Sequence, residues 1–336
     1  MTDATAEQTT SSQSRFGQTI LGTLREFALV PPIIGLIAVG AWVDGNFLTL
    51  ANLATILGAS AALSLMVLGE ALIVITGKFD LTLESNVGIT PALGAMLVIP
   101  ATSAGFGTEW PVAPALLATL LAGALIGFLN GFMIVKLRLN AFIVTLAMLI
   151  VLRGLHVGIT EGQTLWDMPD SFFWLATQTL FWMPMSVWLA LLIFAAAGIF
   201  MRYHRIGRAI YAIGGNADAA RAAGIRVDRI TWGVFVFAGF LAAIAGIILT
   251  GYVGAISASQ GEGMIFTVFA AAVIGGISLD GGRGSMIGAL TGVLLLGIVQ
   301  NILTLAQVPS FWIQAIYGLI ILGSLMIARI TNPKSQ

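Results

Sequence analysis

Long hydrophobic runs, separated by short polar segments, dominate this chain. A helix needs about 20 mostly apolar residues to cross the hydrocarbon core of a bilayer. Ten runs suggest such helices, and boundaries read from a sequence are good to a few residues. The expected spans are 27–43, 51–76, 81–100, 112–135, 141–158, 184–201, 230–254, 264–279, 285–305 and 312–330. The pattern therefore predicts an all-α integral membrane protein with about ten transmembrane helices.

Composition supports this class. The chain of 336 residues is 58% hydrophobic and only 9% charged, whereas soluble domains carry about 25% charged residues. So few charges cannot cover a soluble surface. The absence of cysteine excludes disulfides, thiolate metal sites and a cysteine nucleophile.

The distribution of Lys and Arg predicts the orientation. With the N-terminus inside, 14 of the 15 basic residues fall on the cytoplasmic side, and the exception is Arg153 near the outer end of the fifth span. Residues 1–26 then form a polar cytoplasmic tail with no signal-peptide pattern. Residues 27–330 form a single transmembrane domain, and 331–336 form a second cytoplasmic tail.

The longest outer segment, 159–183, carries acidic and aromatic side chains. It is either an interfacial helix with an aromatic belt or a docking surface for an external partner. The first reading is favoured.

Two glycine stripes at four-residue spacing predict close helix packing, because small residues let helix backbones approach in lipid. They are Gly123, Gly127 and Gly131 in the fourth span, and Gly284, Gly288 and Gly292 at the start of the ninth. The shared stripe suggests the hypothesis that spans 2–5 and 7–10 form an inverted repeat, as in many transporters.

Enzyme motifs are missing from the chain. There is no Walker A, HExxH or GxSxG pattern, and the predicted topology puts His156 and His204 at opposite membrane faces. We therefore predict no catalytic residue, no metal site and no cofactor bound by this chain.

Polar residues inside the predicted spans are candidates for a substrate pathway, because polar groups in a bilayer are costly and face a cavity or a partner. An alternative role is interhelical hydrogen bonding, worth about 0.6 kcal/mol on average. For Glu84 a third reading exists: Asp80 or Thr82 caps the third span, and Glu84 lies near the positive helix end by the membrane interface. The candidates are Glu70, Glu84, Asn86, Asn130, Gln300 and Asn301.

The polar loop 202–229 holds six of the fifteen basic residues. Asn216 is a good N-cap, the Ala-rich run after it favours helix, and Gly224 is a good terminator. We predict a two-turn helix over 217–223 on the cytoplasmic side. Its small side chains suit insertion into the cleft of another protein, and an ordinary linker is the alternative.

Four blocks of sequence resemble the permease subunits of ABC importers of the ribose, xylose and arabinose type. They cover nearly the whole chain from about residue 30, in the right order and at suitable spacing. The blocks are Leu72–Leu83, Asn140–Leu146 with Arg153-Gly154, Gly207–Asn216 with Ala219-Ala220 and Gly224-Ile225, and Ala271–Leu279 with Gly281–Gly284.

This resemblance implies an inner-membrane permease domain at 27–330 that imports a monosaccharide or polyol. The implied partners are a periplasmic substrate-binding protein, a second permease subunit and a double-cassette ATPase that uses ATP and Mg²⁺; nucleic acid is not among them. Relatives of this kind also import branched-chain amino acids or nucleosides, and an ATP-independent facilitator is the alternative of another class. The residues expected to dock into the ATPase are Gly215, Asn216, Ala219, Ala220, Ala223 and Gly224.

Three positions depart from the family pattern. Lys78 stands where the family has glycine, Glu84 where it has a small residue, and Ile265 where it often has an acidic one. These changes concern the membrane path and leave the substrate open. For a neutral solute we expect a path with hydrogen-bonding groups and no fixed strong charge.

Overall fold

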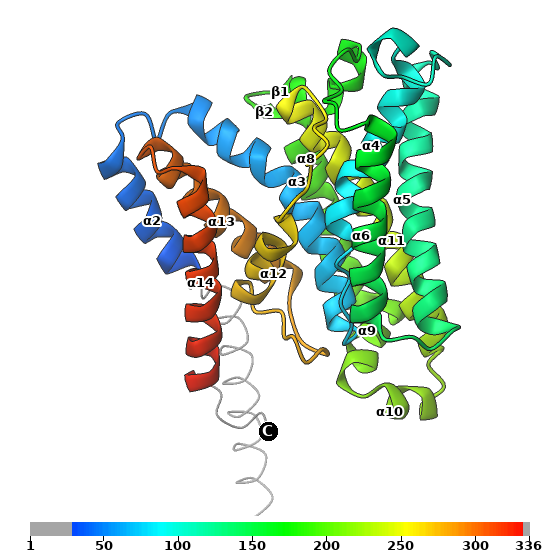
Figure 1. The fold of residues 1–336 in the computed structure, drawn as a ribbon. Coiled ribbons are helices and arrows are strands. Elements are labelled where there is room, and N and C mark those ends of the chain that lie inside the picture. The colour runs from blue at the N-terminus through cyan, green and yellow to red at the C-terminus, as the bar shows by residue number, and fades with distance from the viewer. Residues whose placement is uncertain (1–28, 332–336) are drawn as a thin grey trace, which may run out of the picture.

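The computed structural model describes residues 29–331, and nearly all of its regular structure is α-helical (Figure 1). The helices are α2 (Val30–Val43), α3 (Leu50–Ile75), α4 (Leu83–Val98), α5 (Val112–Val135), α6 (Ala141–Thr160), α7 (Trp174–Thr177), α8 (Met185–Tyr203), α9 (Arg205–Gly215), α10 (Ala217–Ala222), α11 (Val227–Val253), α12 (Met264–Ile274), α13 (Met286–Leu305) and α14 (Ser310–Thr331). The tail predicted at 1–26 lies outside the described residues, and so does the second tail except for Thr331, which ends α14.

Every predicted span coincides with a helix, which confirms the all-α membrane class. Among the described residues, six helices are long and apolar enough to cross a membrane: α3, α5, α6, α8, α11 and α13. The helices α2, α4 and α12 are shorter, at 14, 16 and 11 residues. Six spans are therefore established by length and composition, and ten remains a prediction.

Helices α3 and α11 form the centre of the bundle. They pack against each other, and α11 also packs against α4 and α5. The glycine stripe of α5 makes this contact close: a Cβ added to Gly127 would lie 2.1 Å from the carbonyl oxygen of Phe235 in α11. Gly288 and Gly292 of α13 pack equally closely, but on α12. The prediction of close packing at both stripes is confirmed.

Two breaks, the second of them rich in glycine, interrupt the helices and meet at one end of the bundle. The first break follows Ile75 and the second follows Ile274. The amide of Gly282 in the second break donates to the carbonyl oxygen of Ile75 at 2.9 Å. The carboxyl end of α9 lies against the same place, so three segments far apart in sequence share one junction.

The segment 159–183 does not form the interfacial helix that was predicted. It contains the 3₁₀ turn η2 (Asp170–Phe172), the four-residue helix α7 and an antiparallel pair of short strands, β1 (Thr179–Leu180) and β2 (Met183–Pro184). Leu165 and Ile256 exchange backbone hydrogen bonds at 2.9 and 2.8 Å. This tertiary pairing draws the chain into turns, and long aromatic side chains such as Trp166 and Phe181 remain exposed.

Candidate functional site

The predicted helix at 217–223 is present as α10, which ends one residue earlier, at Ala222. The Asn216 side-chain oxygen accepts hydrogen bonds from the amides of Asp218 and Ala219 at 3.0 and 2.9 Å, as an N-cap does. Gly224 has a φ of +81°, the left-handed conformation that ends helices. Figure 1 shows α10 at the end of the bundle, beyond α9.

One of the predicted docking residues is not on the surface. Ala220 is 4% exposed and packs with Ile213 and Val227 in a small cluster that holds α10 to the protein. Its side chain is therefore an internal contact that supports α10, and its part in ATPase docking remains a prediction. The other predicted docking residues are exposed: Gly215, Asn216, Ala219, Ala223 and Gly224.

Helix α9 was not predicted, although the sequence carries a signal for it. Its apolar residues Ile206, Ala209, Ile210 and Ile213 follow the spacing of one helix face. His204 caps it, since its Nδ1 accepts from the amide of Ile206 at 3.2 Å. The arginines between these positions give the segment a polar composition, which hides the apolar face in the sequence.

Ion pairs surround α10. Arg221 contacts Asp218 at 3.0 Å and Asp228 at 3.4 Å, and Asp228 also contacts Arg138 at 3.2 Å. They connect α10 to the start of α11 and to the turn before α6. Exposed pairs of this kind contribute little individually, so the Asn216 cap and the Ala220 contact are the main local supports of α10.

Two of the pathway candidates belong to one buried network under the first helix break. Glu70 is fully buried, and its Oε1 accepts from the amide of Asp80 at 3.3 Å. Asp80 in turn accepts from the amide and hydroxyl of Thr82. The Asn130 amide donates to the Thr82 hydroxyl at 2.8 Å. Glu70 and Asn130 thus hold the turn between α3 and α4.

Three further candidates bond between helices. Asn86 of α4 donates to the carbonyl oxygen of Gly239 in α11 at 3.2 Å. Asn301 of α13 and Asn52 of α3 form a reciprocal amide pair at 2.8 and 2.9 Å. Gln300 accepts from the Tyr317 hydroxyl at 3.2 Å. This is the interhelical alternative, and these three sites do not converge with Glu70 or Glu84.

Glu84 lies in an ion-pair cluster that the sequence did not predict. Arg153 of α6 contacts Glu84 at 3.0 Å and Glu262 at 3.1 Å. The second Glu84 oxygen accepts from the amide of Ile265 at 3.3 Å. We call Glu84, Arg153 and Glu262 the ionic triad. Glu84 thus contacts Arg153 within α6, and its position near the membrane interface remains a prediction.

Capping of α4 also differs from expectation. Thr82 is the N-cap residue, but its side chain makes no capping hydrogen bond to the helix, and Asp80 binds the Thr82 amide instead. The triad places fixed charges among the helices, whereas the path of a neutral solute was expected to carry no fixed strong charge. Two of the positions that depart from the family pattern are in contact here. Glu84 is acidic where the family has a small residue, and its carboxylate accepts a hydrogen bond from the amide of Ile265, where the family often has an acidic residue.

The two histidines have structural positions. His156 is buried in α6 against Gly88, and His204 caps α9. Within residues 29–331 no group of three or more His, Cys, Asp or Glu side chains could hold a metal ion.

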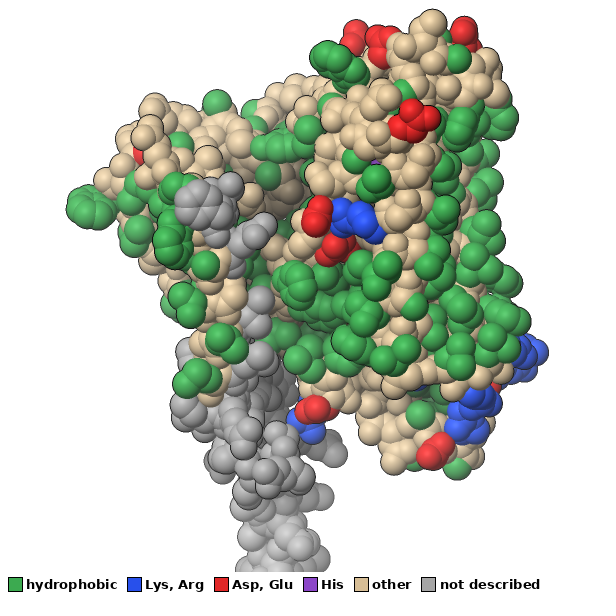
Figure 2. Space-filling model, in the orientation of Figure 1, with side chains coloured by type: hydrophobic (Ala, Val, Ile, Leu, Met, Phe, Trp, Pro, Cys, Tyr) green, Lys and Arg blue, Asp and Glu red, His purple; other side chains and the backbone are tan. Residues whose placement is uncertain are grey.

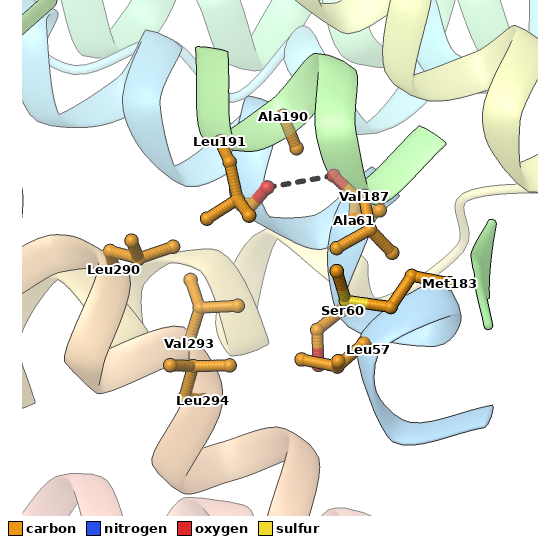
Figure 3. A pocket seen from close by; sticks show the side chains of 11 residues that line it. Leu57, Ser60, Ala61, Met183, Val187, Ala190, Leu191, Leu290, Val293 and Leu294 are labelled. Carbon is orange, nitrogen blue, oxygen red and sulfur yellow. Dashed lines mark hydrogen bonds between the residues drawn. The ribbon is translucent and has the colours of Figure 1, made fainter. Parts of the chain in front are cut away.

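An apolar hollow of about 90 Å³ lies between α3, α8 and α13 (Figure 3). Leucine, valine and alanine side chains line it, with Met183 and two serines. The hydroxyl of Ser64 is bonded to the carbonyl oxygen of Ala61 at 2.8 Å, and the hydroxyl of Ser60 is the one polar group left without a partner among the described residues. A site for a hydroxylated solute needs several polar groups aimed inward. This hollow does not offer them.

Comparison with known proteins identifies the family. Residues 52–328 match the family described as branched-chain amino acid transport system / permease component. The chain is 34% identical over 299 residues to the ribose import permease protein RbsC of Escherichia coli (strain K12), covering 88% of this chain and 91% of that protein. It is also 34% identical over 302 residues to the autoinducer 2 import system permease protein LsrC of Yersinia pseudotuberculosis serotype O:1b (strain IP 31758), covering 90% and 84%.

No solved structure matches the chain. The family match covers most of the sequence, and both relatives are import permeases aligned over nearly their whole length. The apolar helices fit the same role, because a permease must cross the membrane many times. The chain therefore belongs to the branched-chain amino acid transport system / permease component family.

Proposed function

We propose that this protein is the membrane subunit of an ATP-driven importer for a monosaccharide or a related polyol. Its curated relatives are named for the import of ribose and of autoinducer 2. The subunit itself binds no nucleotide, and a separate double-cassette ATPase supplies the energy from ATP and Mg²⁺. A substrate-binding protein delivers the solute, and a second permease subunit completes the path.

The position and exposure of α10 are the observations that support coupling of this subunit to an ATPase. This helix is capped at Asn216, stands at the end of the bundle and turns small exposed side chains outward. The segment before it touches both helix breaks, through Gly214 and Gly215. A partner that displaces α10 would therefore act directly on the two places where the membrane helices are interrupted.

The contacts between helices support an inverted repeat of α3–α6 and α11–α14. If α3 corresponds to α11 and α5 to α13, the main contacts among these helices fall into matching pairs. The pair α5 and α11 matches α13 and α3, and α4 with α11 matches α12 with α3. The pairs within each half also match: α4–α5 with α12–α13, and α4–α6 with α12–α14. Such repeats underlie alternating access in many transporters.

The location follows from the same proposal. The protein lies in the bacterial inner membrane, and the distribution of basic residues puts both termini in the cytoplasm. The α10 end of the bundle then faces the cytoplasm, where the ATPase is. The opposite end, with the turns of 159–183, faces the binding protein.

Two alternatives are tested by the same experiment. The family description names branched-chain amino acids, and a facilitator would need no ATP. We would reconstitute the complex in proteoliposomes and measure the uptake of labelled ribose and leucine with and without ATP. ATP-dependent sugar uptake supports the proposal. Leucine uptake alone favours the first alternative, and uptake without the ATPase favours the second.

A further inference from the structure

The ionic triad lies at mid-depth of the membrane part. The Ser85 hydroxyl, one residue after Glu84, donates to the carbonyl oxygen of Leu149 at 2.8 Å. Leu149 is eight residues from the start of α6, or about 12 Å along a helix that rises 1.5 Å per residue. The hydrocarbon core is about 30 Å thick. Arg153 lies one turn further, and its side chain leans back toward the helix start, so both charges meet near the centre.

The triad is also open to the outside of the subunit. The Glu262 side chain is 69% exposed and that of Arg153 is 20% exposed, whereas Glu84 is 8% exposed. Figure 2 shows basic and acidic side chains side by side about halfway up this face, with hydrophobic side chains below them. On α6 itself, Ile150 is 63% exposed. Charged groups at this depth do not face lipid and instead border water or protein.

The backbone beside the triad is irregular as well. The turns over 257–263 lie against α4: Gln260 donates to the carbonyl oxygen of Val87 at 3.0 Å, and a Cβ on Gly261 would lie 2.3 Å from the carbonyl oxygen of Glu84. Non-helical backbone at membrane depth occurs only where protein buries it or a water-filled cavity adjoins it. The exposed side of this segment, at Glu262, therefore adjoins water or a further protein chain and not lipid.

We infer that the ionic triad lines the solute path and forms its polar contact at mid-membrane. This inference rests on the proposed import function and deepens it. The matching ligand is a neutral solute with several hydroxyl groups. Carboxylate oxygens of Glu262 accept hydrogen bonds from such hydroxyls, and the guanidinium of Arg153 donates to their oxygens. Glu84 is bonded on both oxygens and positions Arg153.

Cysteine accessibility tests the inference directly, because the natural chain contains no cysteine. Glu262→Cys is compared with Val151→Cys, an exposed position on the side of α6 away from Arg153 that is expected to face lipid. In the reconstituted complex we expect a charged, membrane-impermeant thiol reagent to modify residue 262 at least tenfold faster than residue 151. Ribose, delivered by the binding protein during ATP-driven turnover, should slow that modification. Equal, slow labelling of both positions would overturn the inference.

Transport measurements give a second, independent readout. Glu262→Gln should lower ribose transported per ATP hydrolysed at least fivefold and change the preference for ribose over 2-deoxyribose. Glu161→Gln, a neutralised carboxyl at the end of α6, is the matched control. A parallel loss of transport and ATP hydrolysis, with the sugar preference unchanged, would show a purely structural triad and refute the inference. If the wild-type complex imports no sugar, the proposed function itself fails, whatever the labelling shows.

Discussion

Gly214, near the end of α9, lies directly against the carbonyl group of Ile75, the last residue of α3. A Cβ added to Gly214 would fall 1.7 Å from the Ile75 oxygen and 2.4 Å from the amide nitrogen of Gly282. That amide donates to the same oxygen at 2.9 Å. The segment that carries α10 is thus in van der Waals contact with both helix breaks, and glycine is the residue that makes the contact possible.

This contact predicts a sharp difference between two adjacent glycines. Gly214→Ala places a methyl group on rigid backbone, and we expect severe destabilisation, above the 1–3 kcal/mol typical of overpacked cores, with loss of uptake. Gly215→Ala is the matched control, because nothing lies within 4 Å of its added Cβ. Thermal unfolding in detergent measures the effect. Equal melting temperatures for the two variants would contradict the packing described here.

The N-cap of α10 gives a second prediction. Asn216→Ala removes the acceptor for the amides of Asp218 and Ala219, which costs about 1 kcal/mol at a typical cap. Because α10 has only six residues, we expect it to unfold locally and ATPase binding to weaken several-fold. Asn216→Asp keeps an acceptor and should retain binding. Pull-down of the ATPase with each variant checks both, and a capless helix that still binds fully would argue against a role in docking.

Substitutions at two adjacent alanines of α10 test the docking of the ATPase separately from the folding of α10. Ala219 is exposed, so Ala219→Glu should leave the permease folded and abolish ATP-driven uptake by blocking the partner. Ala220 is buried, so Ala220→Glu should detach α10 from Ile213 and Val227. We expect protease cleavage in the 216–226 segment for the second variant only. If Ala219→Glu supports normal uptake, the outward face of α10 does not contact the ATPase.

Glu70 is expected to act in structure and not in solute recognition. Its Oε1 bonds the amide of Asp80, while its Oε2 has no partner among the described residues. Glu70→Gln keeps an acceptor and replaces the buried carboxyl by an amide of the same shape, so stability should stay the same or rise, and uptake and sugar preference should not change. Glu70→Ala leaves the amide unpaired and a cavity, and should cost 2–5 kcal/mol as large-to-small core changes do. A changed sugar preference in Glu70→Gln would instead place Glu70 on the solute path.

The membrane helices and α10 could be predicted because their signals lie in neighbouring residues of the chain. The hydrophobic runs gave the helices because a bilayer span needs a fixed apolar length. Asn216 and Gly224 gave α10 because capping depends on neighbours in the chain. The helical spacing of apolar residues in α9 is the same kind of local signal, but the arginines between those residues mask it.

The ion pair of Arg153 with Glu84, the burial of Ala220 and the close contact at Gly214 are visible only in the tertiary structure. Arg153 and Glu84 are 69 positions apart. In the sequence, Arg153 is the one basic residue that the predicted topology does not place on the cytoplasmic side, and Glu84 is a polar residue with three possible roles. Only the packing of α4 against α6 brings them together, and no local pattern reports which helices pack against each other. Burial likewise separated Ala219 from Ala220, and contact between distant backbones required glycine at Gly214. The order of residues along the chain is enough to show which segments are helical and apolar. The pairing of the helices and the exposure of single side chains depend on long-range packing, because they are set by neighbours that lie far away in the chain.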